Sequence, residues 1–272
     1  MRQKPLYIGI DVGSFSTKAV LLANNTILAS SLSLSGGNYN KAVQYTINKI
    51  EKKAKVSFNE VSAIGVTGCG AETVAFASYK ISEISAQGKG VNFFFPTVRT
   101  VIDLGGRATT VIRIDEEGKA LDFVVSEKCA AGSGRFLEIL ANVLRVKLED
   151  LGPLSLKAKE AVKFTTGCAV FAESEAISRV AEGTAKESVV AGVHKALAAK
   201  IHSLVERVGV ELDYAFTSGG AKDIGLVACL QEELGVPLLV PPEPQLTGAI
   251  GAALFAREKV GMNKNEPVVR ER

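Results

Sequence analysis

A strand–turn–strand unit that occurs twice constrains the fold of this 272-residue chain more than any other feature. In the first copy, residues 6–22 read as two apolar strands, with Asp11 ending the first strand and Gly13 at the bend. Residues 101–114 repeat this order around Asp103. Because the copies lie about one subdomain apart, the sequence predicts an α/β protein with two duplicated lobes.

The polar residues of the two turns suit a phosphate ligand. Backbone N–H groups and hydroxyls of a glycine turn can point at a phosphate, while a carboxylate at a strand end holds Mg²⁺ through water. The residues concerned are Asp11, Gly13, Ser14 and Ser16 in the first copy, and Asp103, Gly105 and Gly106 in the second. Either turn alone could be a plain hairpin, but the paired carboxylates favour a polyphosphate and its metal held by both copies.

A third glycine loop follows the strand expected over residues 213–217. It contains Gly219, Gly220, Ala221 and Lys222. Its glycines would let the backbone approach a flat or charged ligand closely. A bare strand-to-helix turn and a glycine pair required by packing are the alternatives.

Two of the four cysteines stand beside glycines where helices are expected to begin. Cys129 precedes the turn Gly132–Gly134, and Cys168 follows Gly167. Helix N-termini carry unpaired N–H groups and a partial positive charge, so they suit a phosphate or a thiolate that holds an iron–sulfur cluster. A four-thiolate cluster needs two more ligands, which a symmetric dimer sharing one cluster on its two-fold axis would supply.

Spacing alone gives these cysteines no metal-site signature, so reduced and inert thiols are the alternative. Cys229 fits that alternative, because it lies in an apolar helical pattern. Cys69 follows a strand in a glycine loop, where it could be reactive or simply a small residue tolerated near a tight turn.

Further elements follow from hydrophobic periodicity. We expect helices over 39–55, 188–208 and 247–258, and strands from 61 into a glycine loop, over 93–95 and over 237–240. The only histidines, His194 and His202, lie on one helix without a carboxylate or cysteine at ligand spacing, and we expect both at the surface. The charged tail from residue 261 is expected to be disordered.

Composition excludes several classes of protein. The chain is 47% hydrophobic and 22% charged, and its net charge of +3 is not clustered, so no nucleic-acid partner is indicated. The first residues do not read as a signal peptide, and no apolar run approaches the roughly 20 residues that span a bilayer. We therefore expect a cytoplasmic protein without a membrane partner.

The three nucleotide elements, in this order, resemble those of the actin, Hsp70 and sugar-kinase ATPase superfamily. The motifs CAAGSGRFLE and CAVFAESEAIS, together with TGCGAE, EISAQGKG and PQLTGAIGAALFA, resemble the ATP-dependent activators of 2-hydroxyacyl-CoA dehydratases and benzoyl-CoA reductases. This resemblance implies two actin-like (ribonuclease H-like) lobes over residues 1–98 and 99–272, with a nucleotide cleft between them. The helix over 247–258 could pack back on the first lobe.

The resemblance also implies the cofactors and partners. A homodimer would hold one [4Fe–4S] cluster through Cys129 and Cys168 of each subunit. MgATP would be bound by Asp11, Gly13, Ser14, Ser16, Lys18, Asp103, Gly105, Gly106, Gly219, Gly220, Ala221 and Lys222. Reduced ferredoxin or flavodoxin would supply one electron, and ATP turnover would drive it into a partner iron–sulfur enzyme. Residues 132–138, which include Gly132 and Gly134, would link the nucleotide to the cluster.

The sequence departs from the family pattern in two places. The second phosphate loop usually reads Gly-Gly-Gln-Asp-x-Lys, whereas this chain has Arg107-Ala108-Thr109-Thr110 after the glycines. Arg107 could contact the γ-phosphate as a fixed cation, or it could be a surface substitution in a slower enzyme. Gln87 replaces a frequent histidine. Both changes indicate a divergent subgroup, with a double-cubane-cluster protein as a possible acceptor in place of a dehydratase.

Two other functions use the same fold. A small-molecule kinase would need an acceptor pocket with a catalytic carboxylate, and no segment reads clearly as one. An actin-like or Hsp70-like scaffold that uses ATP only to change shape would leave the paired cysteine turns unexplained.

Overall fold

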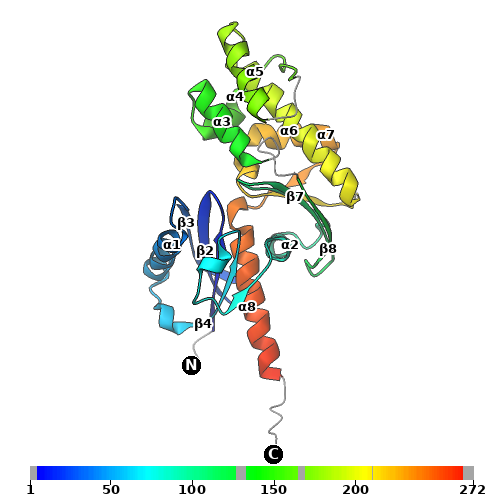
Figure 1. The fold of residues 1–272 in the computed structure, drawn as a ribbon. Coiled ribbons are helices and arrows are strands. Elements are labelled where there is room, and N and C mark those ends of the chain that lie inside the picture. The colour runs from blue at the N-terminus through cyan, green and yellow to red at the C-terminus, as the bar shows by residue number, and fades with distance from the viewer. Residues whose placement is uncertain (1–4, 127–132, 165–168, 210, 266–272) are drawn as a thin grey trace, which may run out of the picture. The chain divides into compact units, whose positions relative to one another are not determined.

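The computed structural model describes residues 5–126, 133–164, 169–209 and 211–265, and Figure 1 shows the fold. The chain forms two compact units. The first contains residues 5–94, 117–119 and 245–265, and the second contains the described residues of 95–116 and 120–244. No helix in these ranges is long and apolar enough to cross a bilayer.

The first unit is built on a mixed sheet of five strands in the order β3-β2-β1-β4-β5. The strands are β1 (Leu6–Val12), β2 (Ser16–Ala23), β3 (Thr26–Leu34), β4 (Val61–Thr67) and β5 (Tyr79–Lys80). Strand β1 is antiparallel to β2 and parallel to β4. The helices are α1 (Tyr39–Ala54), α2 (Glu83–Phe94) and α8 (Thr247–Asn265).

The second unit repeats this topology in the order β10-β9-β6-β7-β8. Its strands are β6 (Thr100–Leu104), β7 (Thr109–Ile114), β8 (Ala120–Val125), β9 (Tyr214–Thr217) and β10 (Leu238–Leu239). Its helices are α3 (Gly134–Leu144), α4 (Leu151–Ser155), α5 (Ala169–Ala181), α6 (Lys186–Val208) and α7 (Ile224–Leu234). Strand β6 is antiparallel to β7 and parallel to β9, as β1 is to β2 and β4. The predicted α/β fold with two lobes is confirmed.

Short 3-10 turns complete the two units, at Phe58–Glu60, Ala71–Thr73, Leu148–Asp150, Gly220–Lys222 and Pro244–Leu246.

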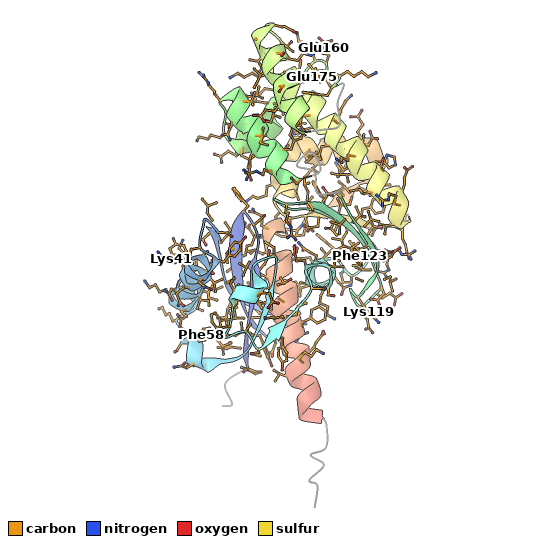
Figure 2. The ribbon with its side chains drawn as sticks, viewed as in Figure 1. Lys41, Phe58, Lys119, Phe123, Glu160 and Glu175 are labelled. Atoms are coloured by element: carbon orange, nitrogen blue, oxygen red, sulfur yellow. The ribbon has the colours of Figure 1, made fainter. Side chains whose placement is uncertain are left out.

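Helix α1 shows how the periodic pattern produces local structure. Asn38 caps it by accepting a hydrogen bond from the backbone N–H of Lys41 at 3.0 Å. Val43, Ile47 and Ile50 recur at helical spacing and are buried in the core. Figure 2 shows Lys41 projecting outward from α1. The helix predicted over 39–55 is therefore confirmed.

Helix α8 packs against the sheet and against α2 with almost no side chain in between. A methyl group on Gly9 of β1 or Gly65 of β4 would lie 1.8 or 2.1 Å from a carbonyl oxygen of α8. A methyl group on Gly251 of α8 or Gly90 of α2 would lie 1.8 or 1.9 Å from a carbonyl oxygen of the other helix. These four positions therefore admit no side chain, and the backbones themselves are in contact (Figure 1).

Two local predictions are wrong. Residues 93–95 were expected to form a strand, but Phe93 and Phe94 belong to α2 and pack edge to face with ring centroids 5.2 Å apart. Packing against α8 favours the helix, because tertiary contacts override the β-propensity of aromatic residues. Helix α8 also continues to Asn265, beyond the expected end at 258, and Val260 still packs on the core.

We expect Gly251→Ala to destabilise the protein by about 1–3 kcal/mol, because the new methyl group collides with a backbone oxygen that cannot turn away. Gly261→Ala in the same helix is the matched control, since no described atom lies within 4 Å of a methyl group there. It should stabilise by about 0.5–1 kcal/mol through helix propensity. Urea unfolding of both variants measures the difference, and equal effects would contradict the proposed close approach.

Candidate functional site

Three polar residues form a row across the first sheet where β1 ends. Asp11 pairs in register with Lys18 of β2 on one side and with Thr67 of β4 on the other. Lys18 Nζ lies 3.0 Å from Asp11 Oδ2, and these side chains are only 11% and 14% exposed. Residues paired in register lie on one face of a sheet, so a cation, a carboxylate and a hydroxyl stand side by side.

The turn between β1 and β2 is closed by hydrogen bonds. The backbone N–H of Gly13 donates to the carbonyl of Ser16 at 3.2 Å. Ser35 Oγ, at the end of β3, donates to the Gly13 carbonyl at 2.6 Å and lies 2.9 Å from Thr17 Oγ1. Ser14 is exposed in this turn, whereas Ser16 is buried. The structure thus brings together the predicted residues of the first phosphate turn.

Backbone encloses the Asp11 carboxylate on two further sides. Gly68 has a φ of +92°, and a methyl group there would lie 2.6 Å from Asp11 Oδ1. Gly248, in the first turn of α8, would place a methyl group 3.3 Å from Asp11 Oδ2. The partial positive charge of the α8 N-terminus favours a carboxylate at this position.

The second unit has the equivalent row with different residues. Asp103 pairs in register with Thr110 of β7 and Thr217 of β9. Thr217 Oγ1 lies 3.2 Å from Asp103 Oδ1 and 3.3 Å from the Ile102 carbonyl. Thr110 therefore occupies the position that Lys18 holds in the first unit.

The turn between β6 and β7 is bonded to the start of α3. The backbone N–H of Gly105 donates to the Ala108 carbonyl at 3.0 Å, and the Gly105 carbonyl accepts from the N–H of Gly134 at 2.8 Å. A methyl group on Gly134 would lie 3.2 Å from that oxygen. Arg107 is exposed in the turn. Gly105 and Gly134, which the sequence placed in one site, are in direct contact.

Ser126 directly precedes residues 127–132, which contain Cys129, and it is hydrogen-bonded to the same hairpin. The N–H of Thr109 donates to Ser126 Oγ at 3.0 Å, and the N–H of Ser126 donates to the Thr109 carbonyl at 2.8 Å. Cys129 and Gly132 lie outside the described residues. Ser126, immediately before residues 127–132, is thus bonded to Thr109 at the start of β7, and Gly134, two residues after them, is bonded to Gly105 of the predicted phosphate turn.

The α3 helix follows its predicted pattern. Phe136, Leu137, Leu140 and Leu144 are buried in the core of the second unit, and Val143 packs against it. Burial of this apolar face fixes α3, and therefore its N-terminus, within the second unit.

Cys168 also lies outside the described residues, directly before α5. Residues 161–164, which lead to it, have no regular secondary structure and are bonded to α6, because the N–H of Val162 donates to the Ser188 carbonyl at 3.0 Å. Gly192 of α6 admits no side chain, since a methyl group would lie 2.1 Å from the Val162 carbonyl. The described residues contain no cluster of three or more histidines, cysteines or acids that could hold a metal.

The remaining two cysteines are half-buried. Burial, and secondly the nearby Glu232 charge, raise the pKa of Cys229 to about 11, so its thiol stays protonated near neutral pH. Cys69 Sγ lies 3.6 Å from the Val12 carbonyl, close to the first phosphate turn.

The third loop lies against the end of β6. Ser218 has a φ of +64°, and its N–H donates to the Pro244 carbonyl at 2.8 Å. A methyl group on Gly220 would lie 2.2 Å from the Leu104 side chain, so packing requires this glycine. Gly219 and Lys222 are exposed, whereas Ala221 is buried. Within the second unit, the loop and Asp103 therefore meet at one sheet edge.

Sequence reasoning missed a buried histidine beside this loop. His194 is 1% exposed, so its expected surface position is wrong. Its Nε2 lies 3.1 Å from Asp223 Oδ2, and its Nδ1 lies 3.1 Å from Ser155 Oγ. Asp223 Oδ1 caps α7 by accepting from the N–H groups of two residues at 3.0 Å each. The signal was available, because His194 follows the buried Val190 by four residues on α6.

Two duplicated lobes with a carboxylate before a glycine turn in each define an actin-like ATPase fold. The family model of the BadF/BadG/BcrA/BcrD ATPases matches residues 8–256, and the chain belongs to this family. The chain is thus an ATPase of the family that the sequence motifs indicated.

Two relatives and one solved structure are similar to this chain over nearly its full length. The 2-hydroxyisocaproyl-CoA dehydratase activator of Clostridioides difficile is 36% identical over 95% of this chain and 97% of its own length. The (R)-2-hydroxyglutaryl-CoA dehydratase activating ATPase of Acidaminococcus fermentans is 36% identical over 93% of this chain and 97% of its own length. A solved structure of the Clostridium difficile activator with bound ADPNP matches with a TM-score of 0.92 over 98% of this chain and 100% of that chain.

We expect Asp223→Ala to destabilise the protein by about 2–4 kcal/mol, because it removes the cap of α7 and the carboxylate that lies 3.1 Å from the buried His194 Nε2. Glu233→Ala is the matched control, since Glu233 lies 3.2 Å from His202 and both side chains are more than a third exposed. Its effect should stay within about 0.5 kcal/mol. Chemical unfolding of both variants is the measurement. If Asp223→Ala lowered the free energy of unfolding no more than the control does, Asp223 would make no significant contribution to stability.

Proposed function

We propose that this ATPase is an activator that passes one electron, coupled to ATP hydrolysis, into a partner iron–sulfur enzyme. The attachment of the Cys129 segment to the second phosphate turn carries the proposal. Gly134 is bonded to Gly105 and Ser126 to Thr109, so a displacement of this turn by its ligand acts on both ends of residues 127–132. The family membership supports the ATPase part of the function.

The nucleotide would be bound by the two phosphate turns and the third glycine loop. Lys18 offers a cation for a phosphate oxygen, and the N–H groups of the glycine turns offer donors. The residues we assign are Asp11, Gly13, Ser14, Ser16, Lys18, Asp103, Gly105, Gly106, Gly219, Gly220, Ala221 and Lys222.

Magnesium fits beside Asp11. Glycine at position 68 keeps side-chain atoms away from Oδ1, since a methyl group there would lie 2.6 Å from it, while Lys18 Nζ lies 3.0 Å from Oδ2. A carboxylate in such a position suits a hydrated Mg²⁺ ion, which keeps most of its water ligands. Asp11, and Asp103 in the second unit, would orient those waters and so the phosphate oxygens that share the metal.

Cys129 and Cys168 are the ligands that we assign to a [4Fe–4S] cluster, with two more from a second copy of the chain. When bound, such a cluster accepts and releases single electrons, and ferredoxin or flavodoxin would be the donor. The residues fit this group, because α5 begins directly after Cys168 and α3 begins five residues after Cys129, and the N-termini of helices favour negative charge. By binding one cluster together, the cysteines of the two copies would also link the subunits of the dimer.

The acceptor is proposed from relatives. Their names describe activators of dehydratases, which supports a dehydratase-type component as the partner. The altered residues after Gly106 suggest a divergent acceptor, such as a double-cubane-cluster protein, as the second possibility.

Protein purified without oxygen should be brown, and Cys129→Ser or Cys168→Ser should abolish its visible absorption, because each removes a thiolate from every shared cluster. Cys229→Ala is the matched control and should keep the colour, since the Cys229 thiol is half-buried and has a raised pKa of about 11. A colourless wild-type protein that takes up no iron on reconstitution would refute the cluster.

Arg107→Gln should lower kcat for MgATP hydrolysis by at least about tenfold while leaving ADP affinity unchanged, because a fixed cation acts on charge that develops in the transition state. Steady-state kinetics and ADP titration measure the two quantities. An unchanged kcat would identify Arg107 as a surface residue without a catalytic role.

A further inference from the structure

The two polar rows differ in whether the hydroxyl of their threonine has a hydrogen-bond partner. Thr217 and Thr67 occupy equivalent places, each in register with the aspartate that is the penultimate residue of the neighbouring parallel strand. Thr217 Oγ1 lies within hydrogen-bond distance of Asp103. Thr67 Oγ1 has no hydrogen-bond partner among the described residues, although Thr67 is only 1% exposed. The first unit therefore contains a buried hydroxyl that the second unit has satisfied.

A buried hydroxyl without a partner costs free energy, and native proteins rarely tolerate one unless a ligand or water completes it. Two serine hydroxyls, on Ser31 and Ser33, are also buried without a hydrogen-bond partner among the described residues. They lie on the edge strand β3, which β2 separates from Asp11 of β1. Thr67 stands beside Asp11 at the sheet edge where Gly68 places no side chain against the carboxylate. Its position therefore points to the ligand of this site.

We propose that Thr67 Oγ1 hydrogen-bonds to an oxygen of the magnesium–polyphosphate ligand beside Asp11, which makes Thr67 a further binding residue of the ATPase. This inference rests on the proposed assignment of Asp11 to MgATP. The oxygen belongs either to a phosphate, which accepts the hydroxyl proton, or to a water of the metal, which donates its own proton to Oγ1. Lys18 holds Asp11 Oδ2 already, which leaves the side of Thr67 for the ligand.

Thr67→Val tests the proposal, because valine keeps the shape of threonine and removes only the hydroxyl. We expect ATP affinity to fall about ten- to hundredfold, the range for a hydrogen bond to a charged group, while the nucleotide-free protein melts at the same temperature or higher. Thr67→Ser retains the hydroxyl and should restore affinity to within about threefold of wild type. Thr67→Ala repeats the test if the valine variant does not fold.

Thr46→Val is the matched control. Thr46 is fully buried in the same unit, but its hydroxyl donates to carbonyls of α1, with Val43 O at 2.8 Å. This variant should melt at a lower temperature and keep its ATP affinity, the reverse of the result for Thr67→Val.

Titration with ATP in magnesium and in EDTA separates the two sources of the oxygen. Weaker binding in both conditions identifies a phosphate oxygen, and weaker binding only with magnesium identifies a metal-bound water. Unchanged affinity of both Thr67→Val and Thr67→Ala in both conditions would overturn the inference while leaving the nucleotide site intact. Absence of ATP binding by the wild-type protein would overturn the proposed site itself.

Discussion

The contact of α8 with the backbone of β1, β4 and α2 is the constraint on which the first unit depends. Four glycines permit it, and each would place even a methyl group about 2 Å from a carbonyl oxygen. Because α8 comes from the end of the chain and β1 from its beginning, this contact closes the unit over its full sequence length. It also sets the start of α8 beside Asp11, so one packing arrangement serves both stability and the site.

The two units show how a duplicated site diverges without a change of fold. Their strand order and register are the same, yet Lys18 faces Asp11 where Thr110 faces Asp103. The first unit thus supplies a cation from within its sheet. In the second unit Arg107 follows the glycines of the turn, and it lies in the turn and not in a strand. The role in hydrolysis that we propose for Arg107 would thus belong to a residue of the turn and not to one paired across two strands.

Sequence reasoning recovered those parts of the protein that depend on local patterns. Alternation and turn residues identified both hairpins, and helical spacing identified the buried face of α3. It failed where distant segments decide the outcome. Phe93 and Phe94 became helical because α8 packs there, and His194 was buried because α7 brings Asp223 to it. The bond between Gly134 and Gly105 was likewise beyond reach, since no local pattern reports which carbonyl a helix N-terminus will meet.

The two attachments that flank residues 127–132 have a consequence for assembly. A free loop loses much conformational entropy when its side chains are gathered around a metal, whereas a short loop already closed at both ends has less to lose. Here Ser126 on one side of residues 127–132 and Gly134 on the other are hydrogen-bonded to the hairpin of β6 and β7. Folding of the second unit therefore fixes the positions between which Cys129 lies, which would lower the entropic cost of gathering its thiolate into the cluster that we propose.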